Sequence, residues 1–156
     1  VQKIALGKTG LLFSWCGFAV SVVCKKSQAT DNLWQLGKHI GMLFQLADDI
    51  KDFDGDKQLK DVCRDIRNLD PSMPIVLALA ENPLIKQRFT TLLADGEIAQ
   101  SDALDLREMI IATKALEKTR SMMSEHVAQA LRLLSDYQGS RGKKYVENFI
   151  SAMCLC

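Results

Sequence analysis

A short acidic segment, Asp48-Asp49-Ile50-Lys51-Asp52, follows an apolar run and holds the side chains best suited to bind a metal ion. In a helix of 3.6 residues per turn, Asp48 and Asp52 lie one above the other and Asp49 lies one step round. Like charges stacked this way repel one another unless a cation lies among them. Carboxylate oxygens suit Mg²⁺, which keeps further positions for water or phosphate oxygens. We therefore interpret Asp48, Asp49 and Asp52 as Mg²⁺ ligands; the alternative is a solvated acidic helix end.

The residues just before the aspartates favour the metal site over the solvated end. Gln45 lies three residues before Asp48, so it borders the same helical face one turn earlier. Gly37 and Gly41 leave one side of the same helix without side-chain bulk, where another helix or a ligand can approach closely.

Two helices must position these residues. Apolar positions at steps of three and four predict a helix over residues 32–53, with the acidic segment at its end. A second helix is predicted over residues 2–25, with Lys8 and Thr9 at the mouth of a run of 14 mostly apolar residues. That run is shorter than the roughly 20 residues a membrane span needs, so we expect a helix buried all round and no transmembrane segment. Lys8 either holds a phosphate or extends to water.

The rest of the chain is predicted to be helical apart from one long loop. Residues 54–72 are irregular and basic, and a loop of this length in a compact domain is usually a lid or a binding loop. Pro74 and Pro83 suit first helical turns. The predicted fold is therefore one all-α domain over residues 1–156, with later helices at residues 74–80, 83–95, 101–113, 115–137 and 143–153.

Composition excludes several classes of function. The net charge of +1 offers no electrostatic surface for nucleic acid. The five cysteines are an odd number without metal-ligand spacing, which favours a reducing, cytoplasmic setting. His39 and His126 have no partner at ligand spacing and receive no role. Because the chain begins at Val1, inside an amphipathic helix, and holds one acidic cluster, we expect it to be incomplete.

Gly41-x-x-Phe44-Gln45-x-x-Asp48-Asp49-x-x-Asp52 resembles the second aspartate-rich motif of the trans-isoprenyl diphosphate synthases, the polyprenyl synthetase family. Upstream, Lys8-Thr9-Gly10 is similar to the family's Lys-Thr motif. Downstream, Asp65-Ile66 and Pro74-Ile75 resemble its loop and the start of its next helix. The resemblance covers nearly the whole chain and is specific in residues 8–80. It implies the C-terminal portion of an isoprenoid-synthase helical bundle around a central apolar cavity.

The family's reaction joins isopentenyl diphosphate to an allylic diphosphate, 1′-4 and head-to-tail. By position, the resemblance implies that Asp48, Asp49 and Asp52 hold Mg²⁺ on the allylic diphosphate. Lys8 would bind that diphosphate, Thr9 would lie beside the developing cation, and Gln45 would orient near both. Phe44 and Lys60 complete the expected substrate contacts. The family usually forms homodimers, and heteromers are a second possibility.

Departures from the family pattern define the alternatives. The first aspartate-rich motif is absent, Asp70 stands where the family has a second loop lysine, and Leu69 precedes it in place of glycine. No glycine precedes Lys60 either. The alternative to a catalytic chain is therefore a non-catalytic or regulatory subunit of a heteromeric prenyl diphosphate synthase. A terpene cyclase shares the fold and metals but ranks lower, because its Asn/Ser/Glu metal motif is not found.

Overall fold

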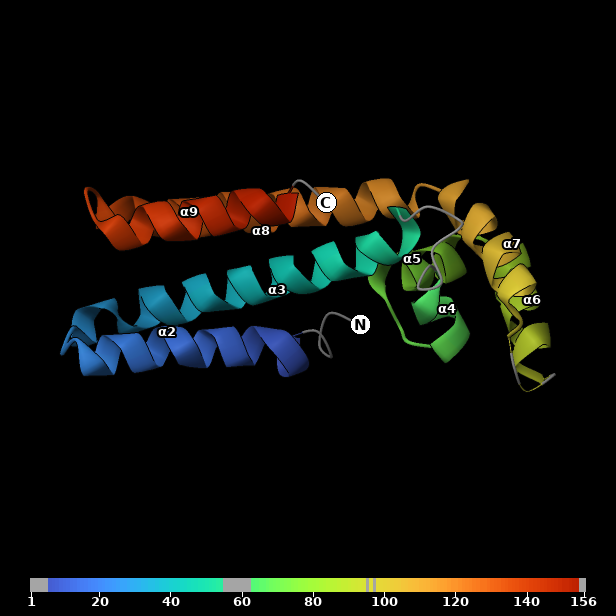
Figure 1. Ribbon diagram of the computed structural model, residues 1–156, viewed down its shortest axis with the longest axis horizontal. Helices are drawn as coiled ribbons and strands as arrows, with labels where there is room; N and C mark the ends of the chain where they lie inside the picture. The colour runs from blue at the N-terminus through green and yellow to red at the C-terminus, as the bar shows by residue number, and fades with distance from the viewer. Residues whose placement is uncertain (1–5, 55–62, 95, 97, 155–156) are drawn as a thin grey trace. The chain divides into compact units, whose positions relative to one another are not determined.

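The computed structural model describes residues 6–54, 63–94, 96 and 98–154, and these residues contain helices and turns but no strand (Figure 1). The elements, in chain order, are η1 (Leu6–Gly10), α2 (Leu11–Val23), η2 (Ser27–Ala29), α3 (Thr30–Asp54), α4 (Arg64–Asn68), α5 (Met73–Glu81), α6 (Pro83–Ala94), α7 (Gln100–Ile111), α8 (Ala115–Leu134), η3 (Ser135–Tyr137) and α9 (Arg141–Cys154). The prediction of an all-α chain is confirmed. The helices predicted after the loop all form, with ends shifted by a few residues.

The chain divides into two compact units, which we describe separately. The aspartate unit is Asp48–Arg120, and the hairpin unit comprises Gln2–Ala47 and Ser121–Cys156. Helices α3 and α8 each contribute residues to both units. The prediction of one domain stays a prediction.

Glycines bring α2 and α3 into backbone contact in the hairpin unit. A Cβ atom on Gly17 would lie 2.1 Å from the Leu33 carbonyl oxygen, and one on Gly37 would lie 2.2 Å from the Phe13 carbonyl oxygen. Any side chain at either position would therefore collide with the main chain of the other helix. Figure 1 shows the two helices running side by side as a hairpin. The bare side of α3 predicted from its glycines thus receives another helix.

The prediction that the apolar run is buried all round is wrong. The two buried residues of α2 are Ser14 and Ser21, whereas Leu12 and Trp15 are 62% and 61% exposed. The reason is steric, because only small residues fit where two backbones touch. The Ser14 hydroxyl donates to the Gly10 carbonyl (2.8 Å), so its burial leaves no polar group unpaired. The large apolar side chains of α2 consequently lie on its outer faces.

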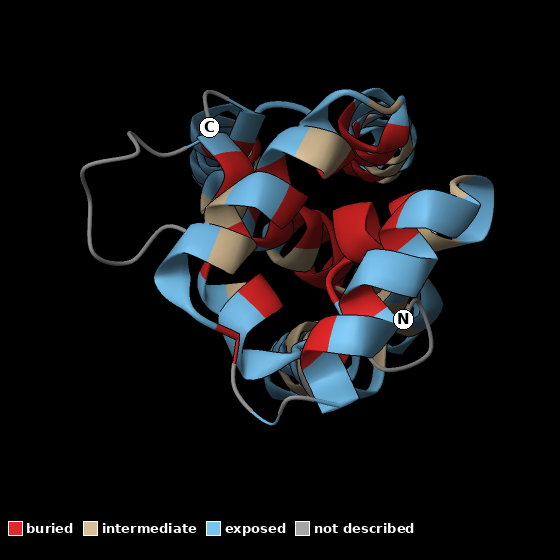
Figure 2. Ribbon diagram, turned by 90° about the vertical axis from the view of Figure 1, so that its right-hand side faces the viewer, coloured by how far each residue is buried: buried red, intermediate tan, exposed pale blue. Residues whose placement is uncertain are grey.

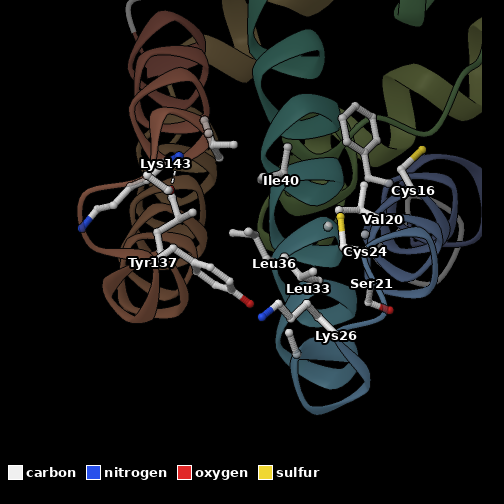
Figure 3. A pocket seen from close by; sticks show the side chains of 18 residues that line it. Cys16, Val20, Ser21, Cys24, Lys26, Leu33, Leu36, Ile40, Tyr137 and Lys143 are labelled. Carbon is white, nitrogen blue, oxygen red and sulfur yellow. Dashed lines mark hydrogen bonds between the residues drawn. The ribbon is translucent and has the colours of Figure 1, made fainter.

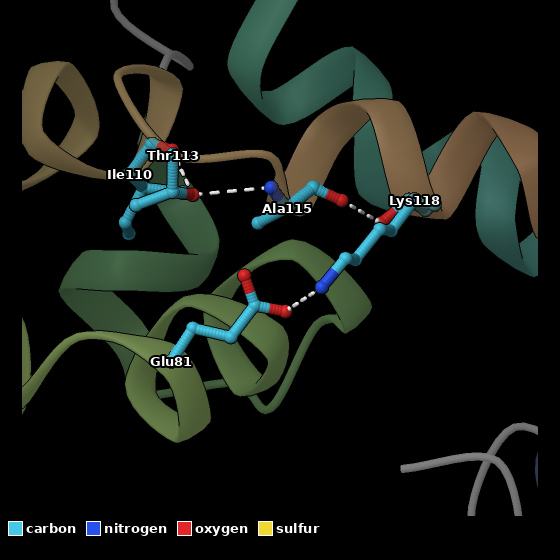
Figure 4. A network of polar contacts seen from close by, with 6 residues as sticks. Glu81, Ile110, Thr113, Ala115 and Lys118 are labelled. Atoms are coloured by element: carbon cyan, nitrogen blue, oxygen red, sulfur yellow. Dashed lines mark hydrogen bonds and ion pairs between the residues drawn. The ribbon is translucent and has the colours of Figure 1, made fainter.

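In the aspartate unit, the buried Arg107 side chain holds the end of α3. Arg107, on α7, donates from Nε to the Phe53 carbonyl oxygen (3.0 Å) and from Nη2 to the same oxygen. The last carbonyls of a helix lack partners within it, so this contact completes the C-terminus of α3. At the start of α8, Thr119 donates to the Ala115 carbonyl, and Lys118 pairs with Glu81 of α5 (Figure 4).

Burial follows one stripe along most helices, as Figure 2 shows by the alternation of buried and exposed ribbon. On α3 the buried positions include Leu36, Ile40, Leu43 and Ala47, in agreement with the predicted core face. Across the residues that the structure describes, no helix is both long enough and apolar enough to cross a bilayer.

Candidate functional site

The three predicted metal ligands occupy different environments at the C-terminal end of α3. Asp48 is exposed, Asp52 is half-buried, and Asp49 is only 5% exposed. The buried apolar residues Leu46, Ile50 and Phe53 turn the opposite face of this segment into the core. Asp48 is therefore the carboxylate most open to a ligand from solvent.

Asp49 accepts a hydrogen bond from the N-terminus of α5. The Met73 N–H donates to Asp49 Oδ2 at 2.8 Å. The first amides of a helix have no partner within it, and a carboxylate there also interacts favourably with the helix dipole. A buried carboxylate is thus satisfied, and the start of α5 is fixed beside the aspartate segment.

Asp52 accepts hydrogen bonds from the N-terminus of α4 in the same way. The Arg64 N–H donates to Asp52 Oδ1 at 2.8 Å, and the Asp65 N–H donates to Asp52 Oδ2 at 3.1 Å. The two residues that flank α4, Cys63 and Leu69, both have left-handed backbone conformations, with φ of 65° and 60°. Helix α4 therefore folds back onto α3 between two backbone turns that glycine would adopt more easily.

Asp65 adds a carboxylate that the sequence analysis noted only as part of the family loop. Burial, followed by the charges of Asp52, Asp49, Asp70 and Asp48, raises the pKa of Asp65 to about 7. Burial and the Asp48 charge also raise the pKa of Asp52, against the two backbone hydrogen bonds that lower it. Asp48, Asp52 and Asp65 thus form a gathering of mutually repelling carboxylates, which a cation would relieve.

The carboxylates of Asp48, Asp52 and Asp65 do not lie in the geometry of a metal site. Within residues 6–54, 63–94, 96 and 98–154, no group of three or more His, Cys, Asp or Glu side chains has metal-binding geometry. Lys60 lies outside the described residues, so its substrate contact stays a prediction. Asp70, at the position of the family's lysine, is exposed.

In the hairpin unit, the side chains of Thr9 and Gln45 contact one another. The Thr9 hydroxyl donates to Gln45 Oε1 at 3.1 Å. Glycine again permits the approach, because a Cβ on Gly41 would lie 2.8 Å from the Gly10 Cα and 2.9 Å from the Thr9 carbonyl oxygen. Lys8 belongs to η1 beside Thr9, and its side chain is not among those described.

Phe44 lies next to Gln45 on the outer side of α3. It is exposed, and its ring centroid is 6.1 Å from that of Phe13 on α2. On α2, Leu12 and Cys16 follow Thr9 at helical steps of three and seven, and both are exposed. Leu12 and Cys16 therefore form part of an exposed apolar face of α2, the helix that follows Thr9 and η1 along the chain.

The two histidines of the chain form a pair, which corrects the interpretation that neither has a partner. His39 Nδ1 and His126 Nδ1 are 2.9 Å apart, and the rings, from α3 and α8, are half-buried. Burial lowers the pKa of both side chains, and Lys38 adds to the effect on each, so both rings favour the neutral form. One ring must then donate to the other.

Comparison with known proteins now places the chain in a family. The profile of the family described as Polyprenyl synthetase matches residues 2–110, and the chain belongs to this family. It is 30% identical over 120 residues to a prenyl transferase of Cyanophora paradoxa, covering 73% of this chain and 35% of that protein. It is 26% identical over 158 residues to the octaprenyl diphosphate synthase of Haemophilus influenzae, covering 97% of this chain and 41% of that protein.

Solved structures agree on the fold. A polyprenyl synthase from Roseobacter denitrificans matches 98% of this chain with a TM-score of 0.86 at 21% identity, and this chain covers 51% of it. A polyprenyl synthase from Caulobacter crescentus, complexed with calcium and isoprenyl diphosphate, matches 98% of the chain with a TM-score of 0.85 at 24% identity, with 48% of that protein covered. The isoprenoid-synthase helical fold is confirmed. The chain spans less than half the length of these curated relatives and about half of these solved proteins.

Proposed function

We propose that this chain supplies part of the active site of a Mg²⁺-dependent prenyltransferase, which joins isopentenyl diphosphate to an allylic diphosphate and makes a longer prenyl diphosphate. The single observation that carries the proposal is the gathering of Asp48, Asp52 and Asp65 at the end of α3. Burial raises the pKa of Asp52 and of Asp65, and the charges of neighbouring carboxylates raise both further. Membership of the family supplies the class of reaction.

The residues fit a hard divalent cation. All the candidate ligands are carboxylate oxygens, and Asp48 is open to solvent, so a metal held there can also meet a substrate phosphate. When bound, the metal would neutralise the charge that develops on the diphosphate as it leaves. Asp49 has a different part in this proposal, since its hydrogen bond to Met73 fixes α5 against the aspartate segment.

The hairpin unit supplies the groups that would meet the allylic chain. Thr9, held by Gln45, would face the carbon from which diphosphate departs, and Lys8 would bind the diphosphate itself. The exposed apolar face of α2 beyond Thr9 would lie along the hydrocarbon and exclude water from the cation. In the reaction the C1–O bond of the allylic diphosphate breaks, C1 bonds to the terminal alkene carbon of isopentenyl diphosphate, and a proton is lost.

Assembly and compartment belong to the proposal as well. We favour a homodimer as the assembly. We favour the cytoplasm as the compartment, in keeping with the free thiols of Cys16, Cys24, Cys63 and Cys154. One relative, from Neurospora crassa, is named a probable mitochondrial hexaprenyl pyrophosphate synthase. A heteromer with a second prenyl synthase chain is the alternative assembly.

The test is an elongation assay with purified protein that carries these 156 residues. Incubated with Mg²⁺, isopentenyl diphosphate and radiolabelled farnesyl diphosphate, it should yield a longer labelled prenyl diphosphate, which chromatography after dephosphorylation resolves. Chelation of the metal should abolish the product. Folded protein that gives no elongation, alone or with a candidate partner chain, would reject a catalytic role and favour the regulatory alternative.

A further inference from the structure

The two histidines of the chain lie apart from the residues of the proposed reaction. His39 lies on α3 and His126 on α8, and both belong to the hairpin unit. The apolar cavity of this unit, about 720 Å³ in volume, is lined by residues of α2, α3 and the segment from the end of α8 into α9, and neither histidine is among them (Figure 3). Neither belongs to the aspartate segment or to the Thr9–Gln45 pair. The histidine pair therefore has no part in the proposed function.

The spacing of the two ring nitrogens suits a shared metal ion. His39 Nδ1 and His126 Nδ1 are 2.9 Å apart, and the ring planes are tilted by 51° with their centroids 5.2 Å apart. Two nitrogens bound at about 2.0–2.1 Å to one ion are about 2.9 Å apart when their bonds to it make a right angle, and about 3.3 Å apart in a tetrahedron. The observed separation is thus that of two neighbouring ligands in a square-planar or octahedral complex.

Both rings are in the protonation state that a metal ligand requires. Burial lowers the pKa of each side chain, so each ring is neutral at neutral pH. Without a metal, one Nδ1 donates its proton to the other. When a metal binds, the donating ring has to carry that proton on Nε2 instead, and no proton leaves the pair. Both rings are half-buried, so an ion can reach them from solvent and keep water as its further ligands.

The charges beside the pair act in opposite directions on a bound cation. Lys38 acts on both rings and disfavours a cation, whereas Glu125 acts on His126 and favours one. Among the residues that the structure describes, no third His, Cys, Asp or Glu side chain completes a metal-binding group. Two imidazoles alone select ions that bind nitrogen well, such as Ni²⁺ and Cu²⁺, over Mg²⁺ and Ca²⁺. The affinity should be well below that of structural sites with four protein ligands.

We propose that His39 and His126 bind a divalent transition-metal ion through both Nδ1 atoms, with Ni²⁺ or Cu²⁺ as the ions whose right-angled coordination fits the pair. The ion takes the place of the hydrogen bond between the rings and links α3 to α8. This site differs in chemistry from the aspartate segment, which offers carboxylate oxygens instead of imidazole nitrogens. Because the ion binds the folded hairpin unit, it raises the stability of that unit in proportion to its occupancy.

Calorimetric titration with Ni²⁺ tests the ligands. Protein that carries all 156 residues and no histidine tag, with Mg²⁺ in excess to occupy the aspartate segment, should bind one equivalent of Ni²⁺. His39→Gln and His126→Gln should each weaken this binding by at least about tenfold, because one nitrogen ligand is lost. Cys16→Ser removes an exposed thiol that competes as a metal ligand, so it is the matched control and should leave the affinity unchanged. Unchanged affinity in either histidine variant, or a tenfold loss in Cys16→Ser, would overturn the site.

Paramagnetic broadening in the wild-type protein gives a second readout that does not depend on how the variants fold. Substoichiometric Ni²⁺ should first broaden the amide NMR resonances beside the pair, those of Lys38 on α3 and Val127 on α8. Amide resonances of the aspartate segment should broaden only at higher Ni²⁺ concentration. Broadening centred on the aspartate segment or on the cysteines of α2, or no broadening at all, would overturn the proposal. Because neither readout measures elongation, both are independent of the assay for the proposed function.

Discussion

At the scale of single residues, the aspartates of α3 have different contacts. Asp48 is exposed to solvent, whereas Asp49 and Asp52 accept hydrogen bonds from the first backbone N–H groups of α5 and α4. A motif read from spacing alone treats the three as equivalent ligands. The spacing along α3 was predictable from 3.6 residues per turn, but the Asp49–Met73 contact joins residues 24 apart and has no sequence signal. The place of Asp65 beside Asp52 was not predicted either, because this contact likewise has no sequence signal.

Ionisation of Asp65 should lower the stability of the folded chain as the pH rises. Its pKa is raised from 3.8 to about 7, so ionisation opposes folding, and stability falls as pH rises from about 4 through 7. Asp65→Asn should therefore raise the melting temperature at pH 8 in chelator, with no difference near pH 4. It should also weaken Mg²⁺ binding, by roughly 10- to 100-fold. Asp105→Asn, an exposed aspartate of α7, should do neither; a stability gain in both variants would remove the assignment to the cluster.

The histidine pair should act in the opposite direction. The pKa of each ring is lowered below 6.5, so its contribution to stability is present above pH 6.5 and is lost as pH falls toward the folded-state value. The charged groups identified near the pair are Lys38, which lowers both pKa values, and Glu125, which raises that of His126. Between pH 7.5 and 5, the melting temperature should fall more steeply for the wild type than for the double variant His39→Gln/His126→Gln. An equally steep fall in both proteins would show that the pair does not titrate in this way.

At the scale of elements, small residues decide how α2 and α3 pack. The composition of α2 suggested a helix buried on all sides, yet its serines and glycines face α3 and its large apolar side chains face outward. Counting apolar residues could not reveal this, because closeness of approach depends on side-chain volume and not on hydrophobicity. By contrast, Pro74, Pro83 and the periodic core face of α3 made the helices themselves predictable, since these signals are local.

The α2–α3 contact should not tolerate a methyl group. Gly37→Ala would place Cβ 2.2 Å from the Phe13 carbonyl oxygen, and a backbone atom cannot rotate away. We expect the free energy of unfolding to fall by roughly 3 kcal/mol or more in chemical denaturation. Gly142→Ala, on α9 with no atom within 4 Å of the new Cβ, should instead stabilise by up to about 1 kcal/mol. Similar values for the two variants would contradict the close approach.

The turn that ends α4 should improve with glycine. Leu69 has a left-handed backbone (φ 60°) and is 42% exposed, so it bears a conformational cost of roughly 1–2 kcal/mol that glycine avoids. After allowing for the greater freedom of glycine in the unfolded chain, Leu69→Gly should stabilise by about 0.5 kcal/mol. Leu93→Gly, at 46% exposure in the helical part of α6, should destabilise by about 1 kcal/mol. Equal losses at both positions would argue against strain at Leu69.

At the scale of the whole molecule, the motif and the family profile lead to the same family, and the motif lies within the residues that the profile matches. The motif around Gln45 and Asp48 was sufficient to suggest it, and the match over residues 2–110 establishes it. The fold match extends over nearly all of the chain while covering about half of each solved protein. Activity of the whole protein is therefore proposed from two groups of residues, one in each unit. The aspartate unit holds the aspartate segment with the Asp65 carboxylate, and the hairpin unit holds the Thr9–Gln45 pair.

The measurement that tests this account most directly is the elongation rate of Asp48→Asn beside that of Asp31→Asn. Both aspartates are exposed on α3, but Asp31 lies at the start of the helix, in its first turn. If Asp48 binds the metal that stabilises the leaving diphosphate, its loss should reduce the rate by at least about a hundredfold, with a near-normal melting temperature. Asp31→Asn should retain a rate close to that of the wild type. A near-normal rate in Asp48→Asn would contradict the metal role and leave Asp48 as a solvated side chain at the end of α3.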